Sequence, residues 1–226
     1  MFNAHTRLAD MITCNPTLVL LMPRLGISFG FGDKTVAEVC KTYGLPLDFV
    51  LLVCNLYTTG EPLPDEQGIA SLDMRLLVPY LQASHRYYTE ERLPHLQRHL
   101  AAVGERAGER CGAVLDRFFE GYKQDIADHF ALEEQKIFPY LQSLEKGGSA
   151  KPSLSRHFSH NHTDLREKIS DLLQILYKYI PSDAPVEELN ELIFGLLQLS
   201  SDFERHALIE DHVMLPYIAY LERRQS

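Results

Sequence analysis

The segment HFALEEQKIFPY, residues 129–140, is repeated in altered form as HALIEDHVMLPY, residues 206–217. Both copies place a Glu four residues after the leading His, a Pro six residues after that Glu, and a Tyr directly after the Pro. The copies lie 77 positions apart, and the same spacing relates Asp125 to Asp202 and His85 to His162. A pattern that recurs at one spacing over this length predicts two helical hairpins built to the same plan.

The helices themselves are indicated by the texture of the chain from residue 71 onward. Apolar residues recur there at helical spacing, with few strand-like alternations. Residues that interrupt helices cluster around Gly104 to Gly112, at Gly147 and Gly148, and in PSDAP at 181–185. These breaks predict helices at 71–107, 112–145, 153–180 and 186–223. Short connections between long amphipathic helices favour an all-α fold, an antiparallel up-down four-helix bundle. Prolines at 94, 139 and 216 predict kinks or early helix ends.

The region before the bundle has a different texture, with short helical patterns separated by Gly and Pro. We expect residues 1–58 to form a small N-terminal helical domain that serves interaction or oligomerisation. Within it, Thr35 and Glu38 are spaced as a capping box, and Gly44 is placed to end the helix that follows. Residues 59–70 contain Pro62, Pro64 and Gly68 and are predicted to be an irregular linker, so the bundle domain would span 71–226.

Composition limits the partners. The chain has 226 residues, 45% of them hydrophobic, and a formal net charge of −9, which disfavours binding to nucleic acid or to an anionic membrane. No stretch approaches the ~18 apolar residues of a membrane span, and the early apolar run lacks the features of a signal peptide. The four cysteines form no C-x-x-C pair, so we expect them to be reduced and mostly buried. A cytoplasmic protein is expected.

The histidines and glutamates of the two hairpins are predicted to converge. In an up-down bundle, two residues on consecutive helices lie at one height when the turn falls midway between them. The midpoint of His85 and His129 is residue 107, that of Glu133 and His162 lies between residues 147 and 148, and that of His162 and His206 is residue 184. All three midpoints coincide with helix breaks. The predicted metal ligands are therefore His85, His129, Glu133, His162, His206 and Glu210.

Four imidazoles and two carboxylates suit two first-row metal ions, with the two glutamates as bridges. A structural zinc site needs only four ligands and prefers thiolates, so a non-haem di-iron centre with open coordination positions is the better match. The centre could carry an oxo bridge, and other divalent metals could take the place of iron. The Glu-x-x-His motif of ferritin-like proteins is not present here.

Each part of the pattern also has a simpler interpretation. A single His-x-x-x-Glu on a helix is usually an exposed polar pair, and His85 or His162 could be interfacial histidines, with His160 competing for the role of His162. Asp125 and Asp202 could either orient imidazoles or be solvated. Tyr88 is a further candidate to close an open metal position. The histidines without a repeat partner are interpreted as surface residues: His5, His95, His99, His157, His160 and His212.

At these residues the chain resembles the hemerythrin-like, or HHE cation-binding, family, and more closely the di-iron repair of iron centres family. The resemblance covers nearly the whole chain and rests on the two repeated segments, on ASHRYYTEERLPHL around His85, and on SHNHTDLREKI around His162. It implies a hemerythrin-like bundle behind a short N-terminal helical domain. It also implies the same six ligands that the spacing predicts.

The chain departs from that family in its N-terminal region. Where the repair family has two adjacent cysteines followed by glycine, this sequence reads Phe29, Gly30, Phe31, Gly32. A family role that depends on those thiols, in redox chemistry or metal handover, is therefore in doubt. The following TVAEVCKTYGL has a faint helix-turn-helix pattern but few basic residues, which favours packing or self-association.

Two functions follow from the pattern and the resemblance. The first is a non-haem di-iron protein that handles O2, NO or peroxide or supports repair of damaged iron-sulfur centres, with an iron-sulfur protein as partner. The second is a non-catalytic sensor of a diatomic gas or of iron that signals through its N-terminal domain, for example by a change in a homo-oligomer. A metallohydrolase is the weaker third reading, because no general base stands out beyond the ligands.

Overall fold

The computed structural model describes residues 1–149, 162–182 and 184–225. Helices dominate these residues, and the described part of the chain contains no β-strand beyond an isolated bridge between Arg7 and Thr35. The predicted all-α fold class is confirmed.

Contacts within the chain define two compact units. The first contains Met1–Ser84, Phe138–Phe158 and Arg205–Ser226, and the second contains His85–Ile137 and Ser159–Glu204. Within the described residues, the borders at 84/85, 137/138 and 204/205 fall in helical segments rather than in loops. The predicted domain border at residues 59–70 stays a prediction.

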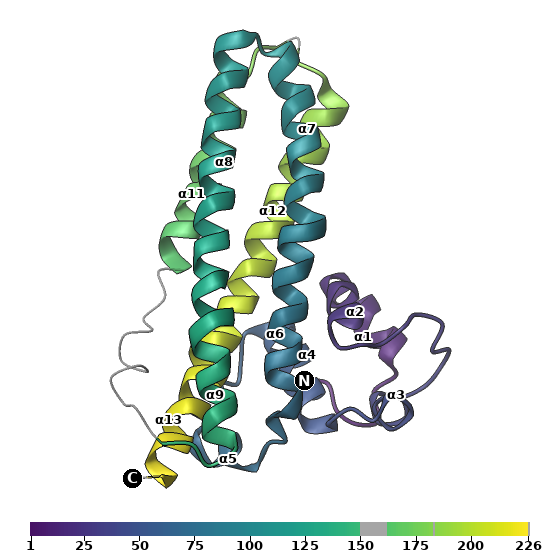
Figure 1. The fold of residues 1–226 in the computed structure, drawn as a ribbon. Helices are drawn as coiled ribbons and strands as arrows, with labels where there is room; N and C mark the ends of the chain where they lie inside the picture. Colours follow the sequence, from purple (N-terminus) through teal and green to yellow (C-terminus); the bar gives the residue numbers. More distant parts are fainter. Residues whose placement is uncertain (150–161, 183, 226) are drawn as a thin grey trace. The chain divides into compact units, whose positions relative to one another are not determined.

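The second unit holds the long helices of the bundle. They are α7 (Leu93–Arg106), α8 (Glu109–Leu132), α11 (His162–Tyr179) and α12 (Val186–Ile209), which run side by side in Figure 1. Apolar residues at helical spacing face inward and form one core, because only this face can be removed from water on all four helices. Its fully buried members include Leu96, Leu100, Phe119, Ile126, Leu172, Leu196 and Phe203.

The turn between α7 and α8 depends on glycines. Gly108 ends the turn with φ +86°, a conformation that side chains with a Cβ disfavour. One turn into each helix, Gly104 and Gly112 bring the two backbones together: a Cβ on Gly112 would lie 2.9 Å from the carbonyl oxygen of Gly104. The glycines that the sequence marks as a break therefore also set how closely the hairpin closes.

Three π-helical turns interrupt the bundle helices, at η3 (Tyr87–Arg92), η4 (Glu133–Ile137) and η5 (Glu210–Met214). A proline ring collides with the carbonyl of the residue four positions earlier in an α-helix. For the prolines at 94, 139 and 216 that carbonyl belongs to residues 90, 135 and 212, which all lie inside these π turns. The helix therefore widens by one residue and continues, where the sequence predicted a kink or an early end.

The first unit begins with the N-terminal helices α1 (Leu8–Cys14), α2 (Leu21–Arg24), α3 (Val36–Tyr43) and α4 (Leu47–Thr59), with a 3-10 turn at Pro16–Leu20. The predicted capping box is confirmed. The Thr35 amide donates to Glu38 at 2.8 Å, and the Glu38 amide donates to the Thr35 hydroxyl at 3.3 Å. Gly44 ends α3 in the left-handed conformation, with φ +66°.

Part of the predicted linker is helical. Asp65 accepts a hydrogen bond from the Gly68 amide and caps α5 (Glu66–Ser71), so the irregular stretch ends before residue 66. A 3-10 turn at Met74–Leu76 leads into α6 (Leu77–Arg86). The unit also contains α9 (Phe138–Glu145) and α13 (Leu215–Arg224), which are joined by a 2.7 Å hydrogen bond from the Tyr140 hydroxyl to Glu222. Asp65, an N-cap residue, is the sequence signal for this helix that the linker prediction missed.

The four cysteines are free thiols. Cys40 and Cys54 are buried, Cys111 is partly buried and Cys14 is exposed, so the expectation of mostly buried cysteines holds for only part of the set. Burial raises the pKa of Cys40 to about 11 and that of Cys54 to about 12. The two buried thiols are therefore protonated and unreactive at neutral pH.

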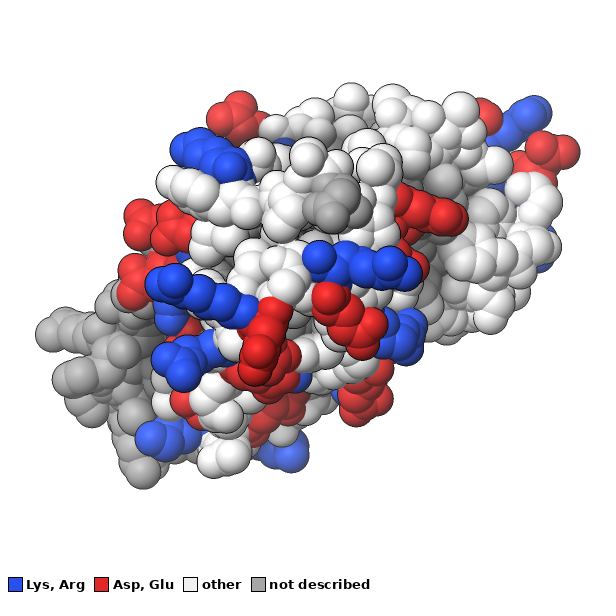
Figure 2. Space-filling view, turned by 90° about the horizontal axis from the view of Figure 1, so that it is seen from above, with Lys and Arg blue, Asp and Glu red and all other residues white. Residues whose placement is uncertain are grey.

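The described helices and one face of the molecule can be compared with what a membrane or a polyanion would require. None of the described helices combines the length and the apolar character that crossing a bilayer requires. On the face shown in Figure 2, basic and acidic side chains are intermixed.

Candidate metal centre

His85 lies between two carboxylates in the second unit. It is 4% exposed and sits near the end of α6, immediately before the π turn η3. Its Nε2 lies 3.2 Å from Oε2 of Glu133, and its Nδ1 lies 3.0 Å from Oε1 of Glu134. The ring therefore lies between the carboxylates of two consecutive residues at the start of η4.

The partner of Nδ1 decides which nitrogen can bind a metal. Because a carboxylate only accepts, Nδ1–H can donate to Glu134, and this tautomer carries its lone pair on Nε2. That lone pair points toward buried Glu133, whereas the Glu134 side chain is 35% exposed and reaches water. Glu134, which lies outside the predicted set, can therefore hold His85 in the tautomer that a ligand binding through Nε2 requires.

Glu133 also faces His129, one helical turn earlier. The distance between His129 Nε2 and Glu133 Oε1 is 3.7 Å, and the two side chains are 11% and 0% exposed. One oxygen of Glu133 is therefore near each of two imidazoles, as a carboxylate bridge requires. The structure brings together three of the six predicted ligands here: His85, His129 and Glu133.

Aromatic rings pack around this group. The His85 ring stacks on Phe130 with centroids 3.9 Å apart and an interplanar angle of 11°. Tyr88, which is fully buried, lies against Phe130 and Phe203, with centroids 5.9 Å away in both cases. These contacts fix the ring of His85 and keep water from the imidazoles.

The second repeat forms an equivalent pair in the first unit. His206 lies near the end of α12 and Glu210 opens the π turn η5, as Glu133 opens η4. His206 Nε2 is 2.8 Å from Glu210 Oε1, and both side chains are fully buried. The predicted pairing within each repeat is therefore present in both copies.

His162 begins α11, and its side chain lies outside the described residues, as does His160. The two aspartates that precede the repeats differ. The Asp125 carboxylate pairs with the Lys168 ammonium at the partly exposed surface, whereas Asp202 is buried. For Asp125 the structure shows an ion pair with Lys168. That all six predicted ligands lie together in one metal centre stays a prediction.

The donor set suits a metal cation. Removing a carboxylate from water costs several kcal/mol unless a positive charge or hydrogen bonds compensate it. Imidazole nitrogens beside the buried carboxylates of Glu133 and Glu210 are donors that a cation would bind, and its positive charge would offset part of this cost. Nitrogen and oxygen donors without thiolate match iron or another first-row ion.

Sequence reasoning missed Glu134, although a signal was present. At the shared spacing of 77 residues, Glu134 corresponds to Asp211, so each repeat carries a second acid directly after its glutamate. An acidic pair of this kind, next to a buried histidine, is typical of a ligand with an orienting carboxylate.

The comparison with known proteins agrees with this geometry. A family model described as the hemerythrin HHE cation binding domain matches residues 76–223, well over half of the chain. The chain therefore belongs to the hemerythrin HHE cation-binding family, and the predicted relationship is confirmed.

Similarity to a curated protein extends beyond the bundle. The iron-sulfur cluster repair protein ScdA of Staphylococcus haemolyticus (strain JCSC1435) is 21% identical over 223 residues, which cover 95% of this chain and 98% of that protein. No solved structure matches the chain.

Proposed function

We propose that the chain binds two irons in a non-haem centre formed by His85, His129, Glu133, His162, His206 and Glu210, and that it supports repair of damaged iron-sulfur centres. The observation that carries the proposal is the position of Glu133, with one oxygen toward the buried His85 imidazole and the other toward the largely buried His129 imidazole. The equal spacing of the repeats and the family membership of residues 76–223 support the joining of the two halves.

The residues have distinct roles in this proposal. Glu133, Glu210 and the four histidines would hold the irons, and Glu134 would accept the Nδ1 proton of His85. Phe130 and Tyr88 exclude water from one side. When bound, the irons supply redox chemistry and open positions for O2, NO or peroxide. The cytoplasm, where thiols stay reduced, is the proposed location.

Repair as the activity is supported by the similarity to the iron-sulfur cluster repair protein over nearly the full length of both chains. It is tested by adding iron-loaded protein to an iron-sulfur enzyme inactivated with NO. We expect recovery of that enzyme's activity with the wild-type chain and none with the variant His129→Ala, His206→Ala. Equal recovery with both proteins would show that the centre is not involved.

Iron content tests the centre itself. Protein reconstituted with Fe(II) should hold about two irons per chain, and the same double variant should lose most of them. His212→Ala is the matched control, because His212 is exposed and lies two residues beyond Glu210. Well under one iron in the wild-type protein, or full iron in the double variant, would disprove the centre.

A second function is favoured by the loop at Phe29 to Gly32. Phe29 is 58% exposed beside Phe31, with ring centroids 6.4 Å apart, at the position where the resemblance to the repair family implies thiols. An exposed phenylalanine beside a partly buried one suits contact with a partner, so we propose as the alternative a gas or iron sensor that signals through this domain. NO-dependent change in oligomeric state without any rescue of the damaged enzyme would select the sensor.

A further inference from the structure

A second group of metal-ligating side chains lies in the bundle, apart from the predicted centre. His95 and His99 are one turn apart on α7, and Glu188 and Glu191 lie one turn apart on α12. Ligand atoms of His95, His99 and Glu191 all lie within 4.8 Å of one another. His95 is ten residues from His85, about 15 Å along a helix, so the two sites are separate.

The two helices approach closely at this level. The Arg92 guanidinium donates to the Gly195 carbonyl at 3.0 Å, and a Cβ on Gly195 would collide with the Leu96 side chain. The contact lies about one turn from Glu191 and from His95, so the imidazoles of α7 and the carboxylates of α12 face each other across a fixed distance.

Glu188 prepares His99 in the same way that Glu134 prepares His85. The Nδ1 atom of His99 is hydrogen-bonded to the Glu188 carboxylate, which leaves the lone pair on Nε2. The His99 side chain is 19% exposed, so water can complete a coordination shell. Its ring lies 4.6 Å from that of His95 at an angle of 74°.

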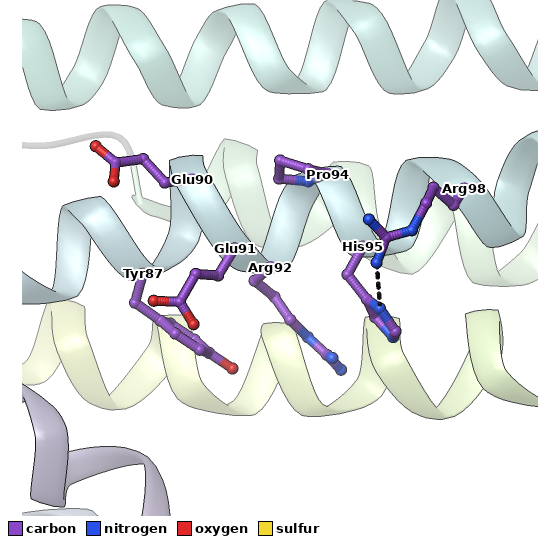
Figure 3. Close-up of a pocket in the computed structure, with 7 residues that line it drawn as sticks. All are labelled: Tyr87, Glu90, Glu91, Arg92, Pro94, His95 and Arg98. Carbon is purple, nitrogen blue, oxygen red and sulfur yellow. Dashed lines mark hydrogen bonds between the residues drawn. The ribbon is translucent and has the colours of Figure 1, made fainter.

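His95 is held as a neutral ring. Burial, followed by the proximity of His99, Arg92 and Arg98, lowers the pKa of His95. Figure 3 shows its ring directed toward α12 and joined to Arg98, whose guanidinium donates to Nδ1 at 3.2 Å. A pocket lined by Tyr87, Glu90, Glu91, Arg92, Pro94, His95 and Arg98 connects this ring with solvent.

We propose that His95, His99 and Glu191 bind a divalent transition metal of the zinc class, with water in the remaining position. Two imidazoles four residues apart on one helix and one carboxylate from elsewhere are a donor set that Zn²⁺ accepts in tetrahedral sites. Bound metal would link α7 to α12. The site is independent of the proposed di-iron function.

Arg98 competes with this metal. If the ion bound Nδ1 of His95, it would replace the guanidinium, and if it bound Nε2, the proton would move to Nδ1 and face the Arg98 donor. Both arrangements cost the Arg98 hydrogen bond. A bond from a charged donor is large enough for its removal to change metal affinity about tenfold.

The experiment is a Zn²⁺ titration of the full-length, iron-loaded protein against a chromophoric chelator. We expect the wild type to bind one more Zn²⁺ per chain than the double variant His95→Ala, His99→Ala. In that variant the affinity of this site for Zn²⁺ should fall by more than about 100-fold. Glu191→Gln keeps both imidazoles and the side-chain shape and should also bind weakly. His5→Ala and His212→Ala serve as controls with unchanged binding.

The variant Arg98→Ala distinguishes a metal site from a group of residues that only form hydrogen bonds. If the site binds metal, this variant should bind Zn²⁺ about tenfold more tightly than the wild type, with unchanged iron content. Equal Zn²⁺ stoichiometry in the wild type and in the double histidine variant would overturn the proposal. So would weaker binding by Arg98→Ala. Failure of the di-iron centre would appear instead as low iron in the wild type, and Zn²⁺ taken up there would be lost in His129→Ala, His206→Ala.

Discussion

The Nδ1 atom of His85 lies 3.0 Å from Oε1 of Glu134, a residue 49 positions later in the chain. This contact fixes the tautomer of a buried imidazole from a side chain that itself reaches water. It favours the tautomer of His85 that the proposed metal centre requires.

Replacement of Glu134 should weaken iron binding without removing a ligand. We expect Glu134→Ala to lower iron affinity about 10-fold to 100-fold, since the Nδ1 proton loses its acceptor, and Glu134→Gln to lie between it and the wild type because its amide oxygen still accepts. Competition with an iron chelator measures the change. Gln135→Ala, at the exposed next position, is the control. Equal affinities in all four proteins would rule out this role for Glu134.

The α7 and α8 contact predicts opposite results at two glycines of one helix. Gly112→Ala should destabilise the fold by about 1–3 kcal/mol, because its Cβ would meet the backbone of Gly104 at 2.9 Å. Gly121→Ala has nothing within 4 Å of its Cβ and should be neutral or stabilising by about 0.5–1 kcal/mol. Chemical denaturation monitored by circular dichroism compares them. A stable Gly112→Ala would mean that the hairpin is less tightly closed than described.

The capping box of α3 predicts a small, pH-dependent contribution. Thr35→Ala should lower the free energy of unfolding by about 1 kcal/mol through loss of the cap. Hydrogen bonds from the Thr35 backbone amide and then its hydroxyl lower the pKa of Glu38 below 4.5. The contribution of the ionised Glu38 carboxylate to the stability of α3 is therefore complete above pH 4.5. It is lost as the pH falls through the folded-state pKa of Glu38.

Exchange protection of the α3 amides measures this effect, and Glu38→Gln should show less dependence on pH than the wild type between pH 5 and pH 3. A wild-type protein whose α3 protection does not change over this range would contradict the role of Glu38.

The thiols should differ sharply in reactivity. Cys14 is exposed, whereas Cys54 is fully buried with a pKa of about 12, so very little thiolate is available there at pH 8. We expect a disulfide reagent to modify Cys14 at once and Cys54 only as the protein unfolds. Cys14→Ser should abolish the fast phase and Cys54→Ser should leave it intact. Fast labelling of Cys54 in folded protein would show that the N-terminal helices open readily.

Much of the fold could be predicted because breaks and periodicity act locally. The expected helix ends at 107, 145, 180 and 223 lie within one residue of Arg106, Glu145, Tyr179 and Arg224. The π turns were not predicted, because a proline within a helix can be accommodated by a bend, an end or a widened turn, and packing selects among them.

The site was predictable to the extent that repetition marked it. Both His-x-x-x-Glu pairs could be found by comparing one half of the chain with the other. Glu134 belongs to no separate motif, and its contact with His85 depends on how two distant helices pack. His95 and His99 have no repeat partner, so comparison of the two halves of the chain does not mark them and predicts surface residues instead. Their spacing of four residues on one helix is the signal that this comparison misses.

The widened turns at Glu133–Ile137 and Glu210–Met214 change how these helices should be read and reused. One additional residue rotates everything beyond it by about 100°, so a helical wheel drawn through such a turn assigns the wrong face to the residues that follow. Each glutamate opens its turn, and the proline that accompanies the turn lies six residues later. A designer who wished to move this ligand pair to another helical scaffold would have to transplant the whole stretch from histidine to proline.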